Sequence, residues 1–342
     1  MHIETIDPAH NDVDLAAMVS CVGRGCQEHY GEFPVPGAQR LRYWESDGYG
    51  NTAPAFGAFD DAPGREGELL GVTNTSFSAL ENLDLVECLI TVPPNSANDD
   101  AAGAKVVEGL LAHILEFSRE QGRSKLAIGV VDALPVERYA AIRAGQLIYT
   151  GVRSVLDLQA VDREQFAAWA EPSAANEAYR LVRWVDRCPD EWAEAYMEAL
   201  VAMDDAPMEE WEIEHPKWEL KRLRGEEDHG IAHGVHKHVT AAVTQDGQIG
   251  GFTIFAGYPQ EPGALDIWDT GVARAHRGHG LGMRLKSDAT LWMLREYPDA
   301  RWVHTYNNQE NEHMLAVNRR LGYRAADRMQ IFEFLINPDG AA

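Results

Sequence analysis

Hydrophobic positions along the chain follow the two spacings of regular secondary structure. Segments in which apolar and polar residues alternate, and short segments of apolar residues alone, predict strands. Apolar residues spaced three and four positions apart predict helices that are buried on one face. Residues 99–120 show the helical spacing clearly, with Val106, Val107, Leu110, Leu111, Ile114 and Phe117 on one face. Gly122 follows as a stop signal.

The same order of elements is predicted twice: strand, helices, three strands, long helix, strand, helix and strand. In the first half the strands are expected at 3–6, 55–59, 68–78, 84–92, 125–131 and 152–158, and the helices after Asn11 or Asp12, at 99–120 and at 136–144. In the second half the strands are expected at 179–185, 239–244, 249–256, 264–272, 301–306 and 329–335, and the helices from Asp190, from Trp211 to Leu223, after residue 282 and at 310–320. Repetition of such a unit indicates duplication.

This repetition predicts an α/β fold (an α+β mixed sheet) in two tandem domains, each with a mainly antiparallel mixed sheet flanked by helices. A length of 342 residues is enough for two separate cores. Residues 160–178 are mixed in character and contain Pro172 and Ser173. We therefore expect a domain at 1–160, a helical linker at 161–178 and a second domain at 179–338.

The charge of the chain limits its partners. The formal net charge is −24, so binding to nucleic acid or to an anionic membrane surface is not expected. The acidity is compatible with a cationic amine as substrate, and it equally serves solubility alone.

No apolar run reaches the ~20 residues that span a bilayer, and the N-terminus does not resemble a signal peptide. The four cysteines form no C-x-x-C pair, which favours a reduced, cytoplasmic protein.

A glycine-rich turn between an apolar strand and a long helix is the strongest chemical signal. The stretch runs from Asp269 to Lys286 and contains Arg277-Gly-His-Gly-Leu-Gly282, with no acidic residue from Val272 to Ser287. Such a turn gathers backbone N–H groups and the positive end of the helix dipole, and glycines let a ligand approach closely. Arg277 adds positive charge, and so can Arg274, Arg284 and Lys286. The turn predicts a pyrophosphate site, although similar spacings also occur in turns that bind nothing.

Two sequence blocks resemble a known family. Arg277, Gly280 and Gly282 match Arg-x-x-Gly-x-Gly, the acetyl-CoA signature of the GNAT acyltransferases (GCN5-related N-acetyltransferases). The later block Asn311-x-x-Met-x-x-x-Asn318-Arg-Arg-Leu-Gly-Tyr323 resembles the family's Asn-x-x-Ala-x-x-x-Tyr-x-x-Leu-Gly-Phe. The resemblance covers about 179–334 and, with the repeated order of elements, suggests a tandem GNAT protein whose first domain is degenerate.

The resemblance implies acetyl-CoA, or another acyl-CoA, as co-substrate, and no metal. In the family, backbone amides just before the turn hold the pantetheine arm and polarise the thioester carbonyl, which here corresponds to Gly271 and the two residues after it. The residues implied in cofactor binding are Val272, Ala273, Arg274, Arg277, Gly278, His279, Gly280, Leu281, Gly282, Met283, Asn311 and Asn318.

The same strand supplies candidates for a general base. Acyl transfer to an amine needs a group that removes a proton, and family members often carry an acid on this strand. Asp269 is the first choice and Asp266 the second, although either can be a structural carboxylate at a strand end. Strand alternation places the two carboxylates on opposite faces unless a bulge intervenes, so they are not expected to act as a pair.

Asn318 departs from the family pattern. Many members carry at this position a tyrosine that protonates the leaving thiolate. An amide can hydrogen-bond the thioester or pantetheine, so Asn318 stays a catalytic candidate, but it does not donate a proton usefully. Tyr306 and Tyr323 are alternative phenols, and Tyr323 is expected to pack in the core. Asn311 is expected to contact the cofactor or, alternatively, to cap a helix.

Other polar and aromatic residues have weaker signals. His229, His233, His236 and His238 precede a strand, and the last two would share a face, but no third metal ligand stands nearby. The tryptophans at 192, 211 and 218 are expected to pack in the core, and lining an acceptor pocket is the alternative.

These observations predict an enzyme that transfers an acetyl or other short acyl group from acyl-CoA to a primary amine of a small molecule by direct attack. A non-catalytic acyl-CoA sensor and a protein or peptide N-acetyltransferase are the alternatives. A monomer or a homodimer is expected. One acyl-CoA site per chain is predicted, because the first half lacks Arg-x-x-Gly-x-Gly, Pro93 and Pro94 remove two N–H donors, and Asp99 and Asp100 would repel a pyrophosphate.

Overall fold

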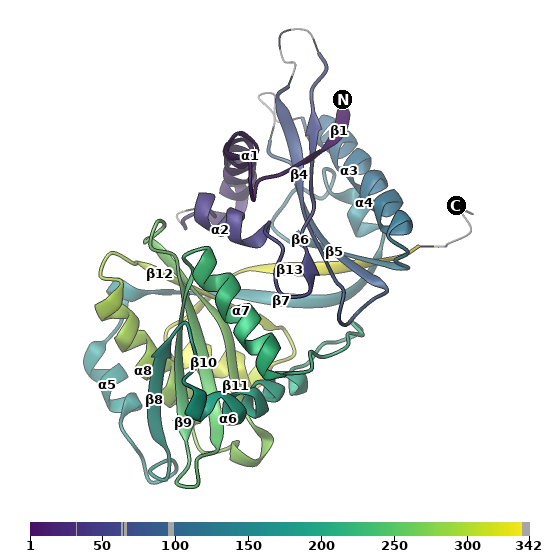
Figure 1. The fold of residues 1–342 in the computed structure, drawn as a ribbon. Coiled ribbons are helices and arrows are strands. Elements are labelled where there is room, and N and C mark those ends of the chain that lie inside the picture. The colour runs from purple at the N-terminus through teal and green to yellow at the C-terminus, as the bar shows by residue number, and fades with distance from the viewer. Residues whose placement is uncertain (32, 63, 65–66, 95–98, 337–342) are drawn as a thin grey trace. The chain divides into compact units, whose positions relative to one another are not determined.

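The computed structural model describes residues 1–31, 33–62, 64, 67–94 and 99–336. They form two compact units (Figure 1). Unit 1 comprises residues 1–150, 209–214 and those from 327 onward, and unit 2 comprises residues 151–208 and 215–326. The predicted domains at 1–160 and 179–338 follow the chain, whereas the units group residues by contact, so the domain assignment stays a prediction.

Unit 1 has a mixed sheet with the strand order β1-β3-β4-β5-β6-β13. The β5–β6 pair is parallel, and the other described pairs along this order are antiparallel. The strands are β1 (His2–Ile6), β2 (Asn51–Thr52), which pairs with β4, β3 (Ala55–Phe59), β4 (Leu69–Ser78), β5 (Leu85–Thr91), β6 (Lys125–Val131) and β13 (Arg324–Leu335). The helices are α1 (Asp12–Tyr30), α2 (Ala38–Trp44), α3 (Asp100–Glu120) and α4 (Ala140–Arg143).

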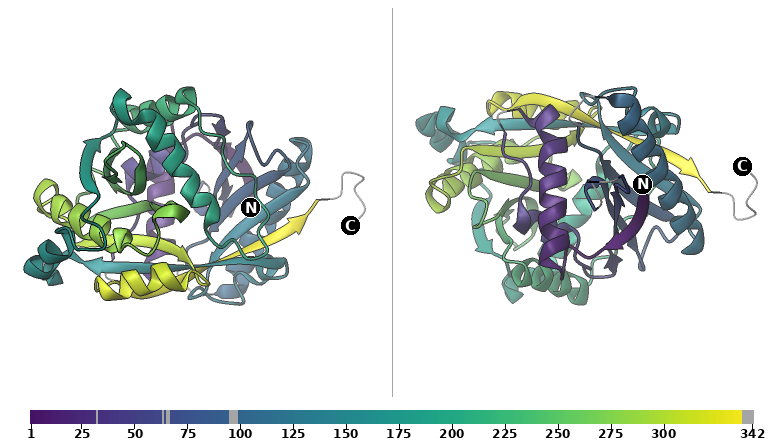
Figure 2. Two further views of the ribbon diagram at one scale, coloured as in Figure 1. Left: turned by 90° about the horizontal axis from the view of Figure 1, so that it is seen from below. Right: turned by 90° about the horizontal axis from the view of Figure 1, so that it is seen from above.

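Apolar side chains cover both faces of this sheet. The apolar stripe of α3 packs with α4 and the inner strands in one core, which contains Val107, Leu110 and Ile114. Helix α1 packs with α2 in a second core, which contains Met18 and Leu41. The right-hand view of Figure 2 shows α1 and α3 on opposite sides of the strands. Two separate apolar faces explain why both helix patterns were visible in the sequence.

Unit 2 repeats this arrangement with the strand order β7-β12-β11-β10-β9-β8. The β11–β12 pair is parallel, and the other described pairs are antiparallel. The strands are β7 (Gln146–Asp157), β8 (Arg180–Val185), β9 (His236–Val243), β10 (Ile249–Gly257), β11 (Ala264–Val272) and β12 (Trp302–Asn308). The helices are α5 (Arg163–Ala170), α6 (Asp190–Leu200), α7 (Leu220–Ala232), α8 (Leu281–Glu296) and α9 (Glu312–Arg320), with short 3₁₀ helices η1 (Leu158–Ala160), η2 (Val201–Asp205) and η3 (Arg274–His276).

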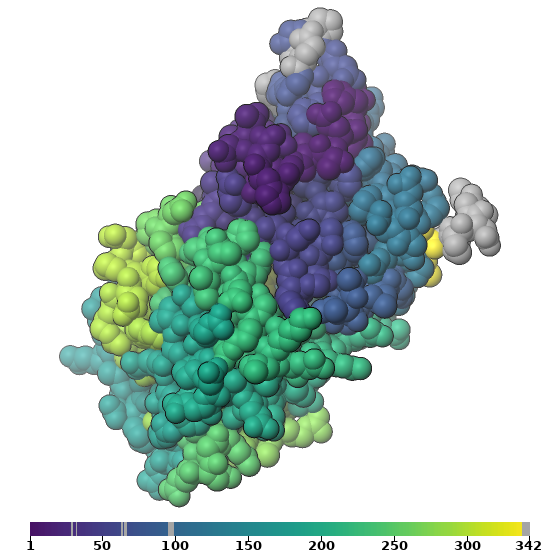
Figure 3. Space-filling model, viewed as in Figure 1, coloured from purple at the N-terminus to yellow at the C-terminus, as the bar shows by residue number. Residues whose placement is uncertain are grey.

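The two faces of the unit 2 sheet have different cores. Trp184, Tyr196 and Ile254 belong to the core beneath α6 and α7. Leu265 and Ile267 belong to the core beneath α5, α8 and α9. Figure 1 shows α6 and α7 on the viewer's side of these strands, and in the space-filling view of Figure 3 side chains coloured teal to green cover that side.

Each sheet is completed by a strand from the other half of the chain. Residues 151–157 of β7 pair antiparallel with β12 in unit 2. In unit 1, β13 pairs antiparallel with β6, from Met329 opposite Val131 to Leu335 opposite Lys125. The predicted strands at 152–158 and 329–335 are therefore real, and both are longer than the sequence pattern indicated.

The predicted fold class is confirmed, and the differences are local. Helix α2 was not predicted, because it has only seven residues and lies within a polar passage. The helix expected at 136–144 shortens to α4. The helix expected from Trp211 begins only at Leu220: residues 209–214 belong to unit 1, and Pro216 has no backbone N–H to donate within a helix. Across the described part of the chain, none of the helices has the length and apolar character needed to cross a membrane.

Candidate active site

Strands β11 and β12 separate halfway along their length. Their parallel pairing runs from Ala264 opposite Trp302 to Ile267 opposite Thr305, and no further pair between them is described. Beyond that point β11 stays paired with β10 as far as Val272. Among the described pairings, the edge of β11 that faced β12 thus has no strand partner from Asp269 onward. Backbone amides need partners, so this opening suits an extended ligand that carries amide groups.

The glycine turn lies directly after this strand. Gly278 and Gly280 have φ values of 83° and 71°, a region that side chains with a Cβ rarely adopt. Gly280 is the N-cap of α8 and offers no side-chain cap, so the first amides of α8 have no side-chain acceptor. A Cβ on Gly282 would meet nothing within 4 Å. The N-terminus of α8 is therefore open and unneutralised, as an anion site requires.

Hydrogen bonds from three parts of unit 2 hold the turn in place. Asn176 donates a hydrogen bond from Nδ2 to the carbonyl oxygen of His279 at 3.1 Å. The backbone amide of Ala273 donates to the carbonyl of Gly250 at 3.1 Å, and Val272 accepts from Nε of Arg277 at 3.0 Å. In this arrangement the predicted thioester-polarising amide of Ala273 is already bonded, so its role in cofactor binding stays a prediction.

The positive charge at the turn is partly neutralised by an acid that sequence reasoning missed. Asp205, at the end of η2, accepts from Arg274 at 2.9 Å and from Arg277 at 2.8 Å. The hydrogen bond with Arg274 is the main cause that lowers the pKa of Asp205. No local signal could reveal this contact, because Asp205 and Arg277 are 72 positions apart. Both arginines remain largely exposed, so the pair is open to exchange for a phosphate.

We expect Asp205→Asn to strengthen acyl-CoA binding. The substitution removes a negative charge from the arginines that face the predicted pyrophosphate, so the dissociation constant should fall by a few-fold at low salt and by less at high salt. Isothermal titration with CoA at two ionic strengths measures this effect. Weaker binding at both would show that Asp205 instead orders the arginines for the ligand.

Two cations expected at the turn are engaged elsewhere. Arg284 is buried and donates to the backbone carbonyls of Ala170, Asn176 and Tyr179 at 2.9–3.0 Å. Lys286 is also buried and bonds to Asn318. The prediction that these two side chains add positive charge for the phosphates is therefore wrong. Helical spacing explains the error, since residues four to six positions into α8 turn toward the core.

A β-bulge changes the placement of the two candidate bases. Along β10 and β11, Ile254 is opposite Asp269, whereas the next residue, Phe255, is opposite Ile267, so Trp268 is the extra residue. Because cross-strand pairs share a face, Asp269 lies with Ile254 on the α6–α7 face, and so does Asp266. The bulge that the sequence left open is present, and strict alternation would have separated these carboxylates.

Asp269 has the properties of a poised base. Burial raises its pKa to about 6, and nearby Lys237 partly opposes this shift. Lys237 itself lies over the ring of Trp268, with 4.9 Å between Nζ and the ring centroid, and burial lowers its pKa. The Asp269 side chain is nonetheless only partly buried by surface area. A carboxyl group that titrates near neutrality and stays accessible suits proton removal from an amine.

The two asparagines of the second sequence block have different surroundings. Asn311 is the N-cap of α9, and its Oδ1 accepts from the backbone amide of Met314 at 3.1 Å. Asn318 is buried and bonds through Oδ1 to Lys286 and through Nδ2 to Asn307. The capping alternative for Asn311 is thus observed, and contact of either residue with a cofactor stays a prediction.

The histidines and tryptophans mostly pack. His238 is buried against the rings of Trp292 and Tyr297, while His236 pairs with Asp186 at 2.9 Å. The described residues contain no group of three or more metal-ligating side chains with suitable geometry. Trp192 and Trp218 pack against the α6–α7 core, and Trp211 contacts Tyr149 within unit 1.

Unit 1 differs at the position that corresponds to the turn. Helix α3 is capped by Asp99, whose carboxylate accepts from the amides of Ala101 and Ala102. Asp100 is paired with the buried guanidinium of Arg138 at 2.6 Å. The predicted turn 93–105 falls in part, at 95–98, outside the described residues. The start of α3 therefore already holds a carboxylate where α8 is open.

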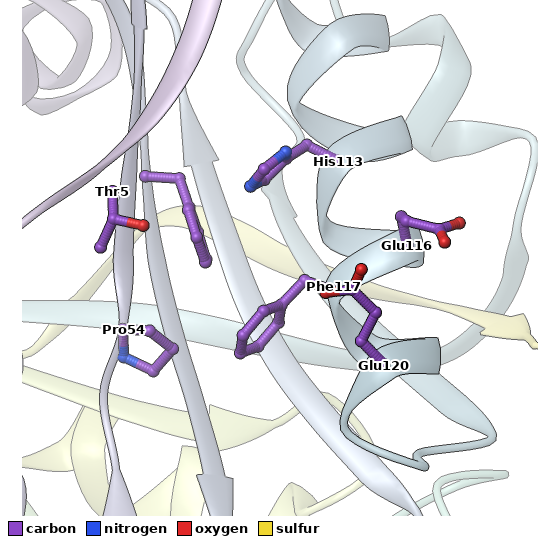
Figure 4. A pocket seen from close by; sticks show the side chains of 7 residues that line it. Thr5, Pro54, His113, Glu116, Phe117 and Glu120 are labelled. Atoms are coloured by element: carbon purple, nitrogen blue, oxygen red, sulfur yellow. The ribbon is translucent and has the colours of Figure 1, made fainter.

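Unit 1 also contains a cavity of about 360 Å³ between its first strands and α3 (Figure 4). Its lining consists of Thr5, Pro54, Phe56, His113, Glu116, Phe117 and Glu120. None of the predicted site residues belongs to it. Figure 4 shows that His113, Glu116, Phe117 and Glu120 all come from α3.

Comparisons with known proteins agree with this geometry. Residues 197–323 match the acetyltransferase (GNAT) family model. No curated protein was found to match the sequence. A tandem GNAT protein from the clavulanic acid biosynthesis pathway aligns with a TM-score of 0.75 and 22% identity over 98% of this chain and 99% of the other. A GCN5-related N-acetyltransferase from Sphaerobacter thermophilus gives 0.62 and 16%, over 98% and 96%.

A GNAT acetyltransferase from Colwellia psychrerythraea has a TM-score of 0.56 and 13% identity over 98% of this chain and 100% of the other. At these identities the likeness concerns the fold. The family model includes the glycine turn and the block that ends at Tyr323. Residues 197–323 thus match the GNAT family model, and the chain as a whole has the fold of tandem GNAT proteins.

Proposed function

We propose that this protein transfers an acetyl or other short acyl group from acyl-CoA to a primary amine of a small molecule. The observation that carries the proposal is the open, uncapped N-terminus of α8 beside the separated strand β11, with Asp269 on that same strand. The amides of Leu281, Gly282 and Met283 and the arginine at 277 would hold the pyrophosphate. Acyl-CoA supplies the thioester. A cytoplasmic location is part of the proposal.

The chemistry required of the protein is limited. The amine attacks the thioester carbonyl directly, and Asp269, or a water molecule that it activates, takes the proton from the attacking nitrogen. The edge of β11 beyond Trp268 supplies backbone groups that can orient the pantetheine arm. The negative net charge of −24 favours the approach of a cationic amine.

Release of free CoA thiol from acetyl-CoA with a panel of amines tests this function. We expect thiol release above the rate of hydrolysis with at least one small primary amine. Binding of acetyl-CoA without release for any amine or peptide would favour the sensor, and release only with peptides would favour the protein N-acetyltransferase.

We also predict one acyl-CoA site per chain, in unit 2. The reason is the contrast between the open start of α8 and the Asp99-capped start of α3. Isothermal titration with acetyl-CoA should give a stoichiometry near one, and charge removal at Arg277 should weaken that single binding event. A stoichiometry near two would show that unit 1 also binds.

A further inference from the structure

Helix α8 buries a lysine that the proposed reaction has not yet used. Only 1% of Lys286 is exposed, and its Nζ donates to Oδ1 of Asn318 at 2.5 Å. Asn318 in turn donates from Nδ2 to Oδ1 of Asn307 at 2.7 Å. The Nζ atom lies 4.9 Å from the ring centroid of Tyr323. A buried amine costs free energy unless it is paired, so a neutral amide as its described polar partner is unusual.

This chain of three side chains lies next to the opening between β11 and β12. Asn307 follows Thr305, the last residue of β12 that pairs with β11. Val303 belongs to the core beneath α8 and α9, and alternation along the strand puts Asn307 on that same face. Asp269 lies on the opposite face of the sheet. A thioester seated in the opening would therefore have a carboxyl group on one face and an amine on the other.

The other titratable groups near Lys286 do not compensate its charge. On α8, Arg284 binds backbone carbonyls and Asp288 is paired with Arg183 from β8. From β9, Thr240 also contacts Asp288. After α9, Tyr323 has a buried hydroxyl without a hydrogen-bond partner, and burial raises its pKa. Burial alone, among the described residues, accounts for the lowering of the Lys286 pKa to about 7.

We propose that Lys286 is the proton donor to the leaving thiolate and that Asn318 is the positioning residue that holds its amine. When the tetrahedral adduct collapses, the C–S bond breaks and its electron pair stays on sulfur. The Lys286 ammonium gives its proton to that sulfur, which yields CoA thiol and a neutral amine that solvent reprotonates. The proton of the attacking amine goes to Asp269. Tyr323 is a poorer donor, because burial makes its phenol less acidic.

This inference rests on the proposed acyl transfer, and three variants test it. Lys286→Met should lower kcat by about 10²-fold, at the low end for acid catalysis because a thiolate leaves readily. Lys286→Arg keeps the charge but not the transferable proton, so it should not restore the rate. Melting temperature and acetyl-CoA affinity serve as controls for folding. Near wild-type turnover in either variant, with these controls retained, would overturn the proposal.

Asn318→Asp is the sharper variant, because it replaces the partner of Lys286 by an isosteric carboxylate. An opposite charge at this distance should raise the Lys286 pKa by about 1–3 units. In the wild type, kcat/KM for acetyl-CoA at saturating amine should fall above pH about 7. In Asn318→Asp that fall should move to higher pH. The titration of the amine substrate is the same for both proteins and does not affect the comparison. An unmoved alkaline limb would contradict the role of Asn318.

A readout without turnover separates this inference from the proposed function. NMR titration of the lysine ¹³Cε signals, with the Lys286 signal assigned by its absence in Lys286→Met, should give a pKa of about 7 that rises in Asn318→Asp. Thiol release that is absent in the wild type for every amine would defeat the proposed function and, with it, the proton donor. Thiol release that is present, together with an ordinary lysine pKa of about 10.4, would defeat the inference alone.

Discussion

Asp269→Asn should reduce turnover by about 10²–10⁴-fold while acetyl-CoA binding is retained. The reason is that Asp269 combines a place on β11, partial exposure and a pKa raised to about 6. In the wild type, kcat/KM should rise with pH up to about 6, since the base works in its ionised form. Steady-state kinetics from about pH 5 to about pH 9 should show this acid limb in the wild type and lose it in the variant.

The sign of the stability change provides a control. The folded-state pKa of Asp269 is higher than its unfolded value, so the folded state binds more protons between pH about 4 and about 6. The free energy of unfolding contributed by this group therefore falls as pH rises through that window. Asp269→Asn removes this fall, so at neutral pH the variant should be at least as stable as the wild type. Asp266→Asn is the matched variant on the same face; if it alone loses activity, Asp266 is the base.

Gly280→Asp should abolish measurable acyl-CoA binding. The substitution places a carboxylate at the N-cap of α8, where it would accept the amide hydrogen bonds intended for the pyrophosphate and repel its charge. A Cβ at this position has room, since its nearest contact would be Asn176 Nδ2 at 3.7 Å. Acyl-CoA at a hundredfold excess over Kd should stabilise the wild type by about 2.7 kcal/mol and so raise its melting temperature. In the variant this increase in melting temperature should disappear.

Gly280→Asn is the control for backbone strain. Asparagine tolerates positive φ better than most residues and has nearly the shape of aspartate, but it carries no charge. The Gly280→Asn variant should therefore retain a reduced thermal shift with acetyl-CoA, whereas the Gly280→Asp variant should show none. Equal loss in both variants would mean that strain or bulk, rather than charge, prevents binding, and an undiminished shift in Gly280→Asp would place the pyrophosphate elsewhere.

Most of the fold was accessible from the sequence, because each half has sheets and helices with separate apolar faces. The stripe of α3 and the turn before α8 were both visible as local patterns. The capping residue Asn11 was also predictable, since asparagine satisfies the first amides of a helix. Helix α2 was missed because seven residues give too short a pattern.

The parts of the site that were missed depend on contacts between distant residues. The bulge at Trp268 is a property of two paired strands and leaves no mark on β11 alone. The pairing of Asp205 with Arg277 and the burial of Lys286 against Asn318 likewise depend on folding. Because these contacts neutralise or bury some of the cations, a count of positive charges near the turn overestimated the positive potential there. Charge near a motif therefore indicates its function only when the helical face that carries the charge is considered.

The reciprocal placement of β7 and β13 has a consequence for synthesis of the chain. As the ribosome completes residues 1–150, the edge of β6 that later pairs with β13 has no partner. The sheet of unit 1 lacks its β13 strand until Leu335 has emerged, so the folding of the first half of the chain is completed only after the last strand has been synthesised. A nonsense mutation just before Arg324 would spare the glycine turn and α9, yet leave the edge of β6 bare. Such a truncated product would present an unpaired strand edge, the kind of surface that leads to aggregation.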